Sequence, residues 1–395
     1  MRAVDYDKSG RILAKLLSGS DYDHSNYWEE IMKKIFGLML SLSLAGGIMA
    51  GCAAETGNTT TAGTGATTTA GTAGTTTAGE DGVTADAVAV NKVYVSPQWV
   101  QSVIDGNQPE SENYVIWEVA WGEESDSPTY ATGHLKGAVH LNTDKLEEPE
   151  DWNIRKPEEI EALMKDYGVT QDTTVIVYSD TPANSADDRA AFAMLWAGVK
   201  NVKALDGGLE AWKAAGYELE TTSNQPVAAT EAFGTTVPAN PQFIITYEEV
   251  LEKQKEDNFK LVSIRSKDEF IGTTSGYSYI PKAGEPKGAI WGHDTDDGSY
   301  NNADGTVVDT DVLAGFLSES DASMDNELSF YCGTGWRAAM PFLIAYEEGY
   351  TDISMYDGGW FVWQKHDELD VQVGDPAGDV EYVQVKDLSD DKATK

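Results

Sequence analysis

An internal repeat constrains this chain more than any other feature. Lys136-Gly137-Ala138-Val139 returns as Lys287-Gly288-Ala289-Ile290, and Asp206-Gly207-Gly208-Leu209 returns as Asp357-Gly358-Gly359-Trp360, in both cases 151 positions later. Self-similarity at a fixed offset indicates one folding unit that is present twice. We therefore predict two tandem domains, residues 91–218 and 241–372, joined by a linker over residues 219–240.

Each copy alternates short apolar runs with longer amphipathic stretches. The runs at 174–178 and 327–331 have the β-branched and aromatic content of buried strands, and helical patterns follow at 190–196 and 342–346. A further strand closes each unit, at 202–205 and 353–356. Strand, helix and strand in succession predict an α/β fold in which each domain is a mainly parallel sheet with helices on both faces. Ligands of such sheets bind beyond the carboxyl ends of the strands.

Composition excludes several classes of protein. The chain carries 28 Lys and Arg against 66 Asp and Glu, a formal net charge of −38, which disfavours binding to nucleic acid. Hydrophobic residues make up 41% of the chain, enough for real cores. The two cysteines, Cys52 and Cys332, exclude a disulfide-stapled scaffold and a cysteine-rich metal centre.

The N-terminal region has the order of an export signal. Basic residues at 33–34 precede an apolar run that ends in small residues immediately before Cys52. Residues 32–51 resemble a bacterial lipoprotein signal peptide, apart from Met49 in a position where Leu is usual. The resemblance implies lipidation of Cys52 and an extracytoplasmic protein anchored to a bacterial membrane only by lipid. A single membrane-spanning helix is the alternative.

The segments on either side of this signal are read from composition. Residues 1–31 carry charges that do not suit an export signal, so we interpret them as a non-native extension or a misplaced start, with Met32 as the true start. Residues 52–90 are almost wholly Thr, Gly and Ala and are predicted to form a flexible tether. Residues 373–395 are predicted to be an acidic C-terminal tail.

The loop after the strand at 327–331 carries the candidate chemistry. It reads Cys332-Gly333-Thr334-Gly335-Trp336-Arg337, and a helix is expected from about Ala338, which would place Pro341 in its first turn. Successive backbone N–H groups at a helix start can surround an anion and favour the nucleophilic thiolate form of Cys332. A buried structural cysteine is the alternative.

Together, the tandem copies, this six-residue loop and the Asp-Gly-Gly endings resemble the rhodanese family of sulfurtransferases. The resemblance covers roughly residues 93–370. It implies that Cys332 takes the outer sulfur of an anionic donor, holds it as a persulfide and passes it on, while Arg337 and Arg265 neutralise the donor. It also implies that the remaining loop residues bind substrate: Gly333, Thr334, Gly335 and Trp336. Two positions depart from the family pattern, Ser263 and the segment 285–287, where Lys287 either approaches the site or lies at the surface.

The first copy lacks the same chemistry. Ser179 aligns with Cys332, Ala120 aligns with Arg265, and the loop contains several aspartates. We predict that this domain is catalytically inactive and covers one side of the active domain. For Arg189 we expect a solvated helix start, with a reach toward the second domain as the alternative.

No cofactor and no metal site are expected. His293 and the Asp/Asn-rich loop at 294–311 suggest a cation at first sight, but their spacing does not fit a twelve-residue calcium loop. A solvated acidic loop is the preferred interpretation.

The predicted function is transfer of a sulfane sulfur from thiosulfate or 3-mercaptopyruvate, through Cys332, to cyanide or a thiol. A non-catalytic sulfur carrier or redox sensor is one alternative. A cysteine phosphatase or arsenate reductase is another, although the loops of those enzymes are one residue longer. The sequence leaves the physiological donor, the acceptor and the oligomeric state open.

Overall fold

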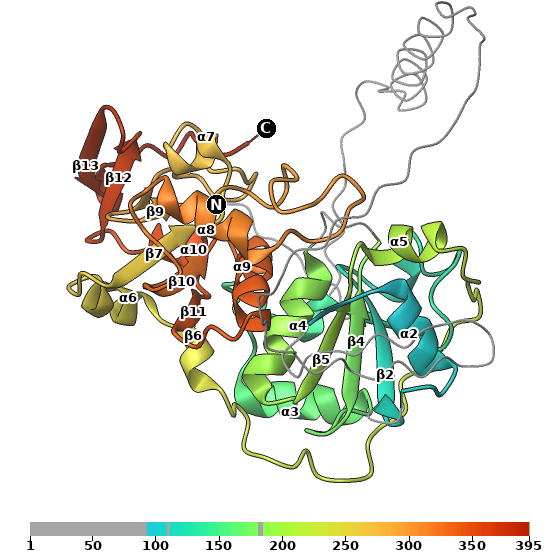
Figure 1. Cartoon of the computed structure of the whole chain (residues 1–395). Coiled ribbons are helices and arrows are strands. Elements are labelled where there is room, and N and C mark those ends of the chain that lie inside the picture. Colours follow the sequence, from blue (N-terminus) through green and yellow to red (C-terminus); the bar gives the residue numbers. More distant parts are fainter. Residues whose placement is uncertain (1–92, 109–110, 181–184, 395) are drawn as a thin grey trace, which may run out of the picture. The chain divides into compact units, whose positions relative to one another are not determined.

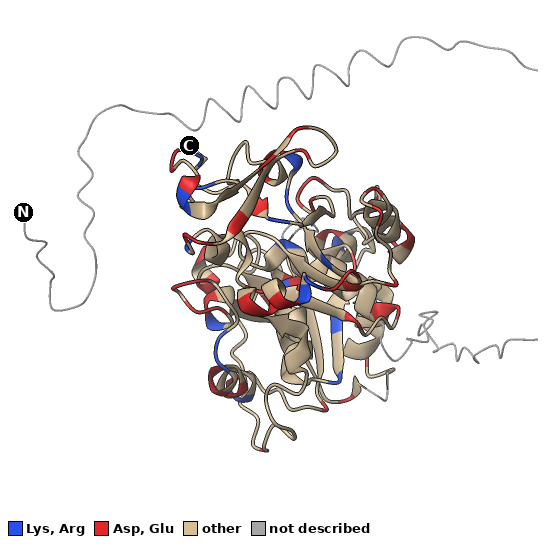
Figure 2. Cartoon of the chain, turned by 90° about the vertical axis from the view of Figure 1, so that its left-hand side faces the viewer, with Lys and Arg blue, Asp and Glu red and all other residues tan. Residues whose placement is uncertain are grey.

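The computed structural model describes residues 93–108, 111–180 and 185–394, all of which belong to one compact unit. The extension at 1–31, the signal at 32–51, the lipidation site Cys52 and the tether at 52–90 lie outside the described residues. Within the described ranges, no helix is long and apolar enough to cross a bilayer. Figure 2 shows segments coloured as Asp or Glu spread over both domains, with segments coloured as Lys or Arg between them.

The first domain is built on a parallel five-stranded sheet (Figure 1). In spatial order its strands are β1 (Tyr94–Val95), β5 (Asn201–Leu205), β4 (Thr174–Tyr178), β2 (Tyr114–Ala120) and β3 (Val139–Asn142). Its helices are α2 (Pro97–Ile104), α3 (Pro157–Asp166), α4 (Ala186–Ala197) and α5 (Gly208–Ala214). Short 3₁₀ turns add η2 (Glu124–Asp126) and η3 (Thr143–Lys145).

The second domain repeats this order. Its parallel sheet runs β6 (Ile244–Ile245), β11 (Ile353–Tyr356), β10 (Glu327–Tyr331), β7 (Phe259–Ser263) and β9 (Ile290–Trp291). Its helices are α6 (Tyr247–Lys253), α7 (Lys267–Phe270), α8 (Thr310–Ser318), α9 (Trp336–Glu347) and α10 (Gly359–Trp363), with 3₁₀ turns η4 (Pro241–Phe243) and η5 (Val385–Asp387). The predicted α/β class with two tandem sheets is confirmed.

Alternation along the strands explains why helices cover both faces of each sheet. In β4, Val175 and Val177 join a core with α3 and α4, whereas Ile176 and Tyr178 join another with α2 and α5. In the second domain, one core contains α8 and α9 and the other contains α6 and α10.

The two domains share one of these cores. Helix α4 packs against α9, and the rings of Phe192 and Phe342 meet edge to face with their centroids 4.8 Å apart. The apolar residues of both helices belong to a single buried cluster. This shared core fixes loops of the first domain over the carboxyl edge of the second sheet.

Two details differ from the sequence-based expectations. Helix α9 begins at Trp336 rather than near Ala338, so the placement of Pro341 in the first turn is wrong and Pro341 lies inside the helix. The segment expected as an acidic tail contains β13 (Val380–Gln384), which pairs with β12 (Asp370–Gly374). Together with β8 (Glu285–Pro286) these strands form a small antiparallel sheet.

Candidate active site

Cys332 lies at the carboxyl end of β10, the middle strand of the second sheet. Its side chain is buried, with 1% of the residue exposed. The backbone N–H of Gly335 donates to the Cys332 Sγ at 3.1 Å, and helix α9 starts at the next residue. A main-chain donor and the helix start therefore both direct partial positive charge at the sulfur.

The two loop glycines are required by their neighbours. Gly335 has a φ of 97°, a conformation that disfavours other residues, and a Cβ there would lie 2.7 Å from Arg189 Nη1. A Cβ on Gly333 would collide with the ring and hydroxyl of Tyr277. The two glycines thus allow the loop to pass close to the side chains of Arg189 and Tyr277, both of which are far from it in the sequence.

Arg337 is held by two carboxylates and a tyrosine hydroxyl. Glu269 accepts two hydrogen bonds from its guanidinium, both at 2.9 Å, and Asp294 accepts a third at 2.9 Å. Its Nη2 also donates to the Tyr277 hydroxyl at 2.9 Å. Burial opposes ionisation of Glu269, but Arg265 and Arg337 outweigh it and lower the pKa of this carboxyl to about 2. Asp294 is only 4% exposed, so the solvated role expected for it is wrong.

Arg265 lies behind this cluster rather than in it. Its guanidinium is fully buried and donates to Glu285 at 2.6 Å, to Glu269 at 3.3 Å and to the carbonyls of Gly284 and Ser275. Burial is the main cause that raises the pKa of Glu285, to about 8. Arg265 is not among the residues that line the cavity described below, and it acts on Arg337 through their shared partner Glu269. Lys287 lies at the surface, where it pairs with Asp370 at 3.2 Å.

The first domain contributes a buried arginine to the site. Arg189 is fully buried, donates to Glu147 at 2.8 Å and to Asp357 of the second domain at 2.5 Å, and so was wrongly expected to be a solvated helix start. Its Nη2 also donates to the carbonyl of Trp152 at 3.1 Å. Glu147 in turn accepts from Trp336 Nε1 at 2.9 Å. A chain of hydrogen bonds therefore runs from Asp357 through Arg189 and Glu147 to the active loop.

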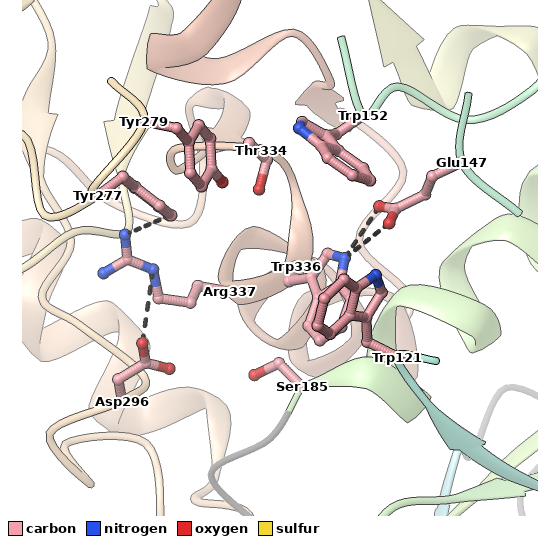
Figure 3. A pocket seen from close by; sticks show the side chains of 10 residues that line it. All are labelled: Trp121, Glu147, Trp152, Ser185, Tyr277, Tyr279, Asp296, Thr334, Trp336 and Arg337. Atoms are coloured by element: carbon pink, nitrogen blue, oxygen red, sulfur yellow. Dashed lines mark hydrogen bonds and ion pairs between the residues drawn. The ribbon is translucent and has the colours of Figure 1, made fainter. Parts of the chain in front are cut away.

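A cavity of about 530 Å³ opens beside the loop (Figure 3). Three loop residues line it, Thr334, Trp336 and Arg337, and seven others complete its wall: Trp121, Glu147, Trp152, Ser185, Tyr277, Tyr279 and Asp296. Burial is the main cause that raises the pKa values of Tyr277 and Tyr279.

Sequence reasoning missed most of the cavity wall. Those seven residues come from loops and helix starts of both domains, and no local motif surrounds them. Of the four loop residues predicted to bind substrate, Thr334 and Trp336 line the cavity, as does the predicted catalytic Arg337, whereas Gly333 and Gly335 act through backbone shape. One sequence signal could have identified the contact between the domains: Arg189 follows the first-domain counterpart of the active loop, and Asp357 belongs to the repeated Asp-Gly-Gly segment of the second domain.

The first-domain counterpart confirms the alignment of the repeats but lacks the nucleophile. The carbonyl of Ser179 accepts from Leu209 N at 3.1 Å, as the carbonyl of Cys332 accepts from Trp360 N at 2.9 Å. Across residues 93–108, 111–180 and 185–394, no group of three or more His, Cys, Asp or Glu side chains is placed to hold a metal ion.

The comparisons with known proteins decide the family. The model of the rhodanese-like domain matches the chain twice, over residues 97–215 and 246–366, which is more than half of its length. The chain belongs to the rhodanese family. Both matched ranges correspond to the two parallel sheets, and the second contains the loop from Cys332 to Arg337.

Several relatives of this rhodanese protein are sulfurtransferases. The chain is 37% identical over 292 residues to thiosulfate sulfurtransferase YnjE of Escherichia coli (strain K12), an alignment that covers 72% of this chain and 66% of that protein. The crystal structure of YnjE superposes with a TM-score of 0.67, covering 71% of this chain and 68% of that one. A structure of EanB with hercynine is 31% identical with a TM-score of 0.68, covering 72% of this chain and 70% of that one.

Proposed function

We propose that this protein is a thiosulfate sulfurtransferase in which Cys332 carries the sulfur. The observation that carries the proposal is the single cysteine at the carboxyl end of β10, with the Gly335 N–H directed at its sulfur at 3.1 Å. The similarity to thiosulfate sulfurtransferase YnjE supports thiosulfate as the donor.

The reaction divides into two balanced steps. In the first, the Cys332 thiolate attacks the outer sulfur of thiosulfate, the S–S bond of the donor breaks, and its electron pair leaves with sulfite. In the second, a nucleophilic acceptor attacks the outer sulfur of the resulting persulfide and restores the Cys332 thiolate. The Cys332 thiolate is thus the nucleophile of the first step and the leaving group of the second.

Local charge supports the first step. Arg337 lies beside the sulfur and is fixed in place by Glu269 and Asp294, so its orientation needs no rearrangement when the donor arrives. The Gly335 N–H stabilises charge on Sγ as the persulfide forms and is consumed. Both groups are attached to the rigid start of α9.

The test is a thiosulfate:cyanide assay on the full chain beside the Cys332→Ser variant. We expect thiocyanate from the wild type and none from the variant. Mass spectrometry after incubation with thiosulfate should add one sulfur atom to the peptide that contains Cys332. Thiocyanate formation by neither protein, or equally by both, would refute the proposal.

For the cellular location, we propose a lipid anchor at Cys52 that holds the two domains at a bacterial membrane. The basic, apolar and small-residue order of residues 32–51 supports it. Labelled fatty acid should be incorporated into the wild-type chain and not into Cys52→Ser. Incorporation into both proteins would contradict the anchor.

A further inference from the structure

The cavity beside Cys332 is larger than either small substrate of the proposed reaction requires. Its volume of about 530 Å³ falls in the range of sites that enclose whole organic ligands, whereas thiosulfate and cyanide each contain only a few atoms. Five of its ten lining residues are aromatic: Trp121, Trp152, Tyr277, Tyr279 and Trp336. The wall is therefore suited to an organic molecule rather than to a small inorganic anion.

The charge of the wall does not suit a second anion. Arg337 is the one cation among the ten lining residues, and its guanidinium is already compensated by Glu269 and Asp294. Two lining residues are acidic, Glu147 and Asp296. The chain as a whole carries a net charge of −38, which adds a long-range attraction for cations.

The cationic residue and the tryptophans lie on different sides of the cavity. Figure 3 shows Arg337, Tyr277 and Asp296 on one side, and the three tryptophans with Glu147 on the other. Aromatic rings together with a carboxylate bind ammonium and quaternary ammonium groups, because the faces of the rings and the carboxylate all attract positive charge. The tryptophan side thus forms a candidate cation site at the end of the cavity away from Arg337.

Three features of this side indicate that it is built for a ligand. Trp121 is 67% exposed, so its ring is accessible to a ligand in the cavity. Trp152 adopts a φ of 62°, a strained conformation for a bulky residue. Ser185, a residue of the cavity wall with a φ of 50°, is 1% exposed, and its buried hydroxyl has no hydrogen-bond partner among the described residues.

We propose that this cavity is the acceptor site and that the acceptor is a small organic cation bearing a thiol. The inference rests on the proposed sulfurtransferase function and names the acceptor class for it. The ammonium or quaternary ammonium group binds among Trp121, Trp152, Trp336 and Glu147, and the thiol reaches toward Cys332. The acceptor thiol attacks the outer sulfur of the persulfide, the S–S bond to Cys332 breaks, and the electron pair returns to the Cys332 sulfur as thiolate. The acceptor attacks as its thiolate, the proton of its thiol passes to the transferred outer sulfur, and the acceptor leaves as its own persulfide.

The decisive experiment compares two acceptors of the same shape on the full-length protein loaded with thiosulfate. Thiocholine carries the positive charge, and 3,3-dimethylbutane-1-thiol is its neutral counterpart. We expect kcat/KM per thiolate, with the thiol pKa of each acceptor determined separately, to be at least about tenfold higher for thiocholine than for the neutral thiol, as one desolvated cation–π contact provides. Choline, which lacks the thiol, should bind in calorimetry and compete with thiocholine.

Variants at Trp121 locate the effect, since this exposed side chain can change without disturbing the core. Trp121→Leu should remove the preference for thiocholine, and Trp121→Phe should keep part of it. Tyr382→Leu is the matched control, because Tyr382 is 56% exposed and does not line the cavity. The control should behave as the wild type does.

The outcomes separate this inference from the proposed function. If the protein forms thiocyanate but shows equal kcat/KM for both thiols and no choline binding, the cationic acceptor is refuted and the sulfurtransferase stands. If no persulfide forms on Cys332, the proposed function fails, and choline binding measured without donor still decides whether the cavity takes cations. A preference for thiocholine that Trp121→Leu leaves unchanged would also overturn the placement of the site.

Discussion

Arg189 offers the sharpest test of how the inactive domain supports the active one. Its guanidinium is fully buried, bonds to Glu147 and Asp357, and lies directly against Gly335 of the loop. Replacement by Met keeps an unbranched side chain of similar length but removes the charge. Two buried carboxylates, 3% and 4% exposed, then lose their shared cation.

The expected cost is large. Removing one partner from a buried ion pair destabilises a protein by about 3–5 kcal/mol. Burial already raises the pKa of Glu147 to about 7 in the presence of Arg189, so loss of this cation raises it further. At a pH below the raised pKa of Glu147 in the variant, protonation neutralises this carboxyl and limits the loss of stability. At a pH above that pKa, the folded variant holds an unpaired buried charge. The loss of stability in Arg189→Met should therefore be greater at pH 8 than at pH 6.

The assay is urea unfolding of wild type and Arg189→Met at both pH values, beside thiocyanate formation. Lys200→Met is the control, because the Lys200 pair with Asp172 is exposed and such pairs contribute about 0–1 kcal/mol. Arg189→Met combined with Glu147→Gln and Asp357→Asn should recover part of the stability. Activity should fall by about 10- to 100-fold, since a small shift of the loop misplaces Cys332.

The reasoning would be refuted by two results in particular. A loss below about 1 kcal/mol would show that Arg189 does not compensate these carboxylates. Normal activity in a variant that is strongly destabilised yet folded would show that the hydrogen-bond chain to Trp336 does not position the loop.

Three further predictions concern single residues of the site. Gly335→Ala combines an unfavourable φ with a close contact to Arg189, so it should lower the free energy of unfolding in urea by at least about 1–3 kcal/mol. Gly137→Ala is the control and should lower it less, because Gly137 has a comparable φ of 78° but open space around it. The pKa of Glu269 is lowered from 4.5 to about 2, so its carboxylate adds stability that is fully present above pH 4.5. The free energy of unfolding of wild type should therefore exceed that of Glu269→Gln by about 3 kcal/mol above pH 4.5, and this difference should vanish as the pH falls toward 2. A difference that stays constant with pH would argue against this role. Because Glu147 ionises near pH 7 while it faces Arg189, Asp357 and Trp336, choline should bind more tightly at pH 8 than at pH 6 in wild type, and the difference should be smaller in Glu147→Gln, where only Asp296 of the acidic lining residues still titrates, its pKa raised by burial to about 6. Tighter binding at pH 6 would contradict its role.

Repetition and periodicity were sufficient for the architecture. The two strands and the one helix placed in each copy appear at the expected positions, because the spacing of apolar residues is a local property of the sequence. The active loop was also recognisable, since a nucleophile, two glycines and an arginine within six residues are close in sequence as well as in space. Helix α9 was placed two residues late because Pro341, usually confined to a first turn, lies inside it.

Long-range electrostatics could not be read from the chain in the same way. Arg337 was correctly expected near the nucleophile, but its partners Glu269 and Asp294 lie 68 and 43 residues away and were not identified. Arg189 and Asp357, separated by 168 residues, meet only because α4 packs against α9. The sequence does not distinguish which of its 66 acidic residues become buried, because burial depends on the folded structure.

The sequence alone therefore determined two parallel sheets and a cysteine at the end of one central strand, because both follow from patterns within short stretches. Only the tertiary structure decided which charges are buried together and what lines the cavity beside Cys332. The physical reason is that desolvation and charge pairing depend on every element packed around a group, and those elements come from both copies of the repeat.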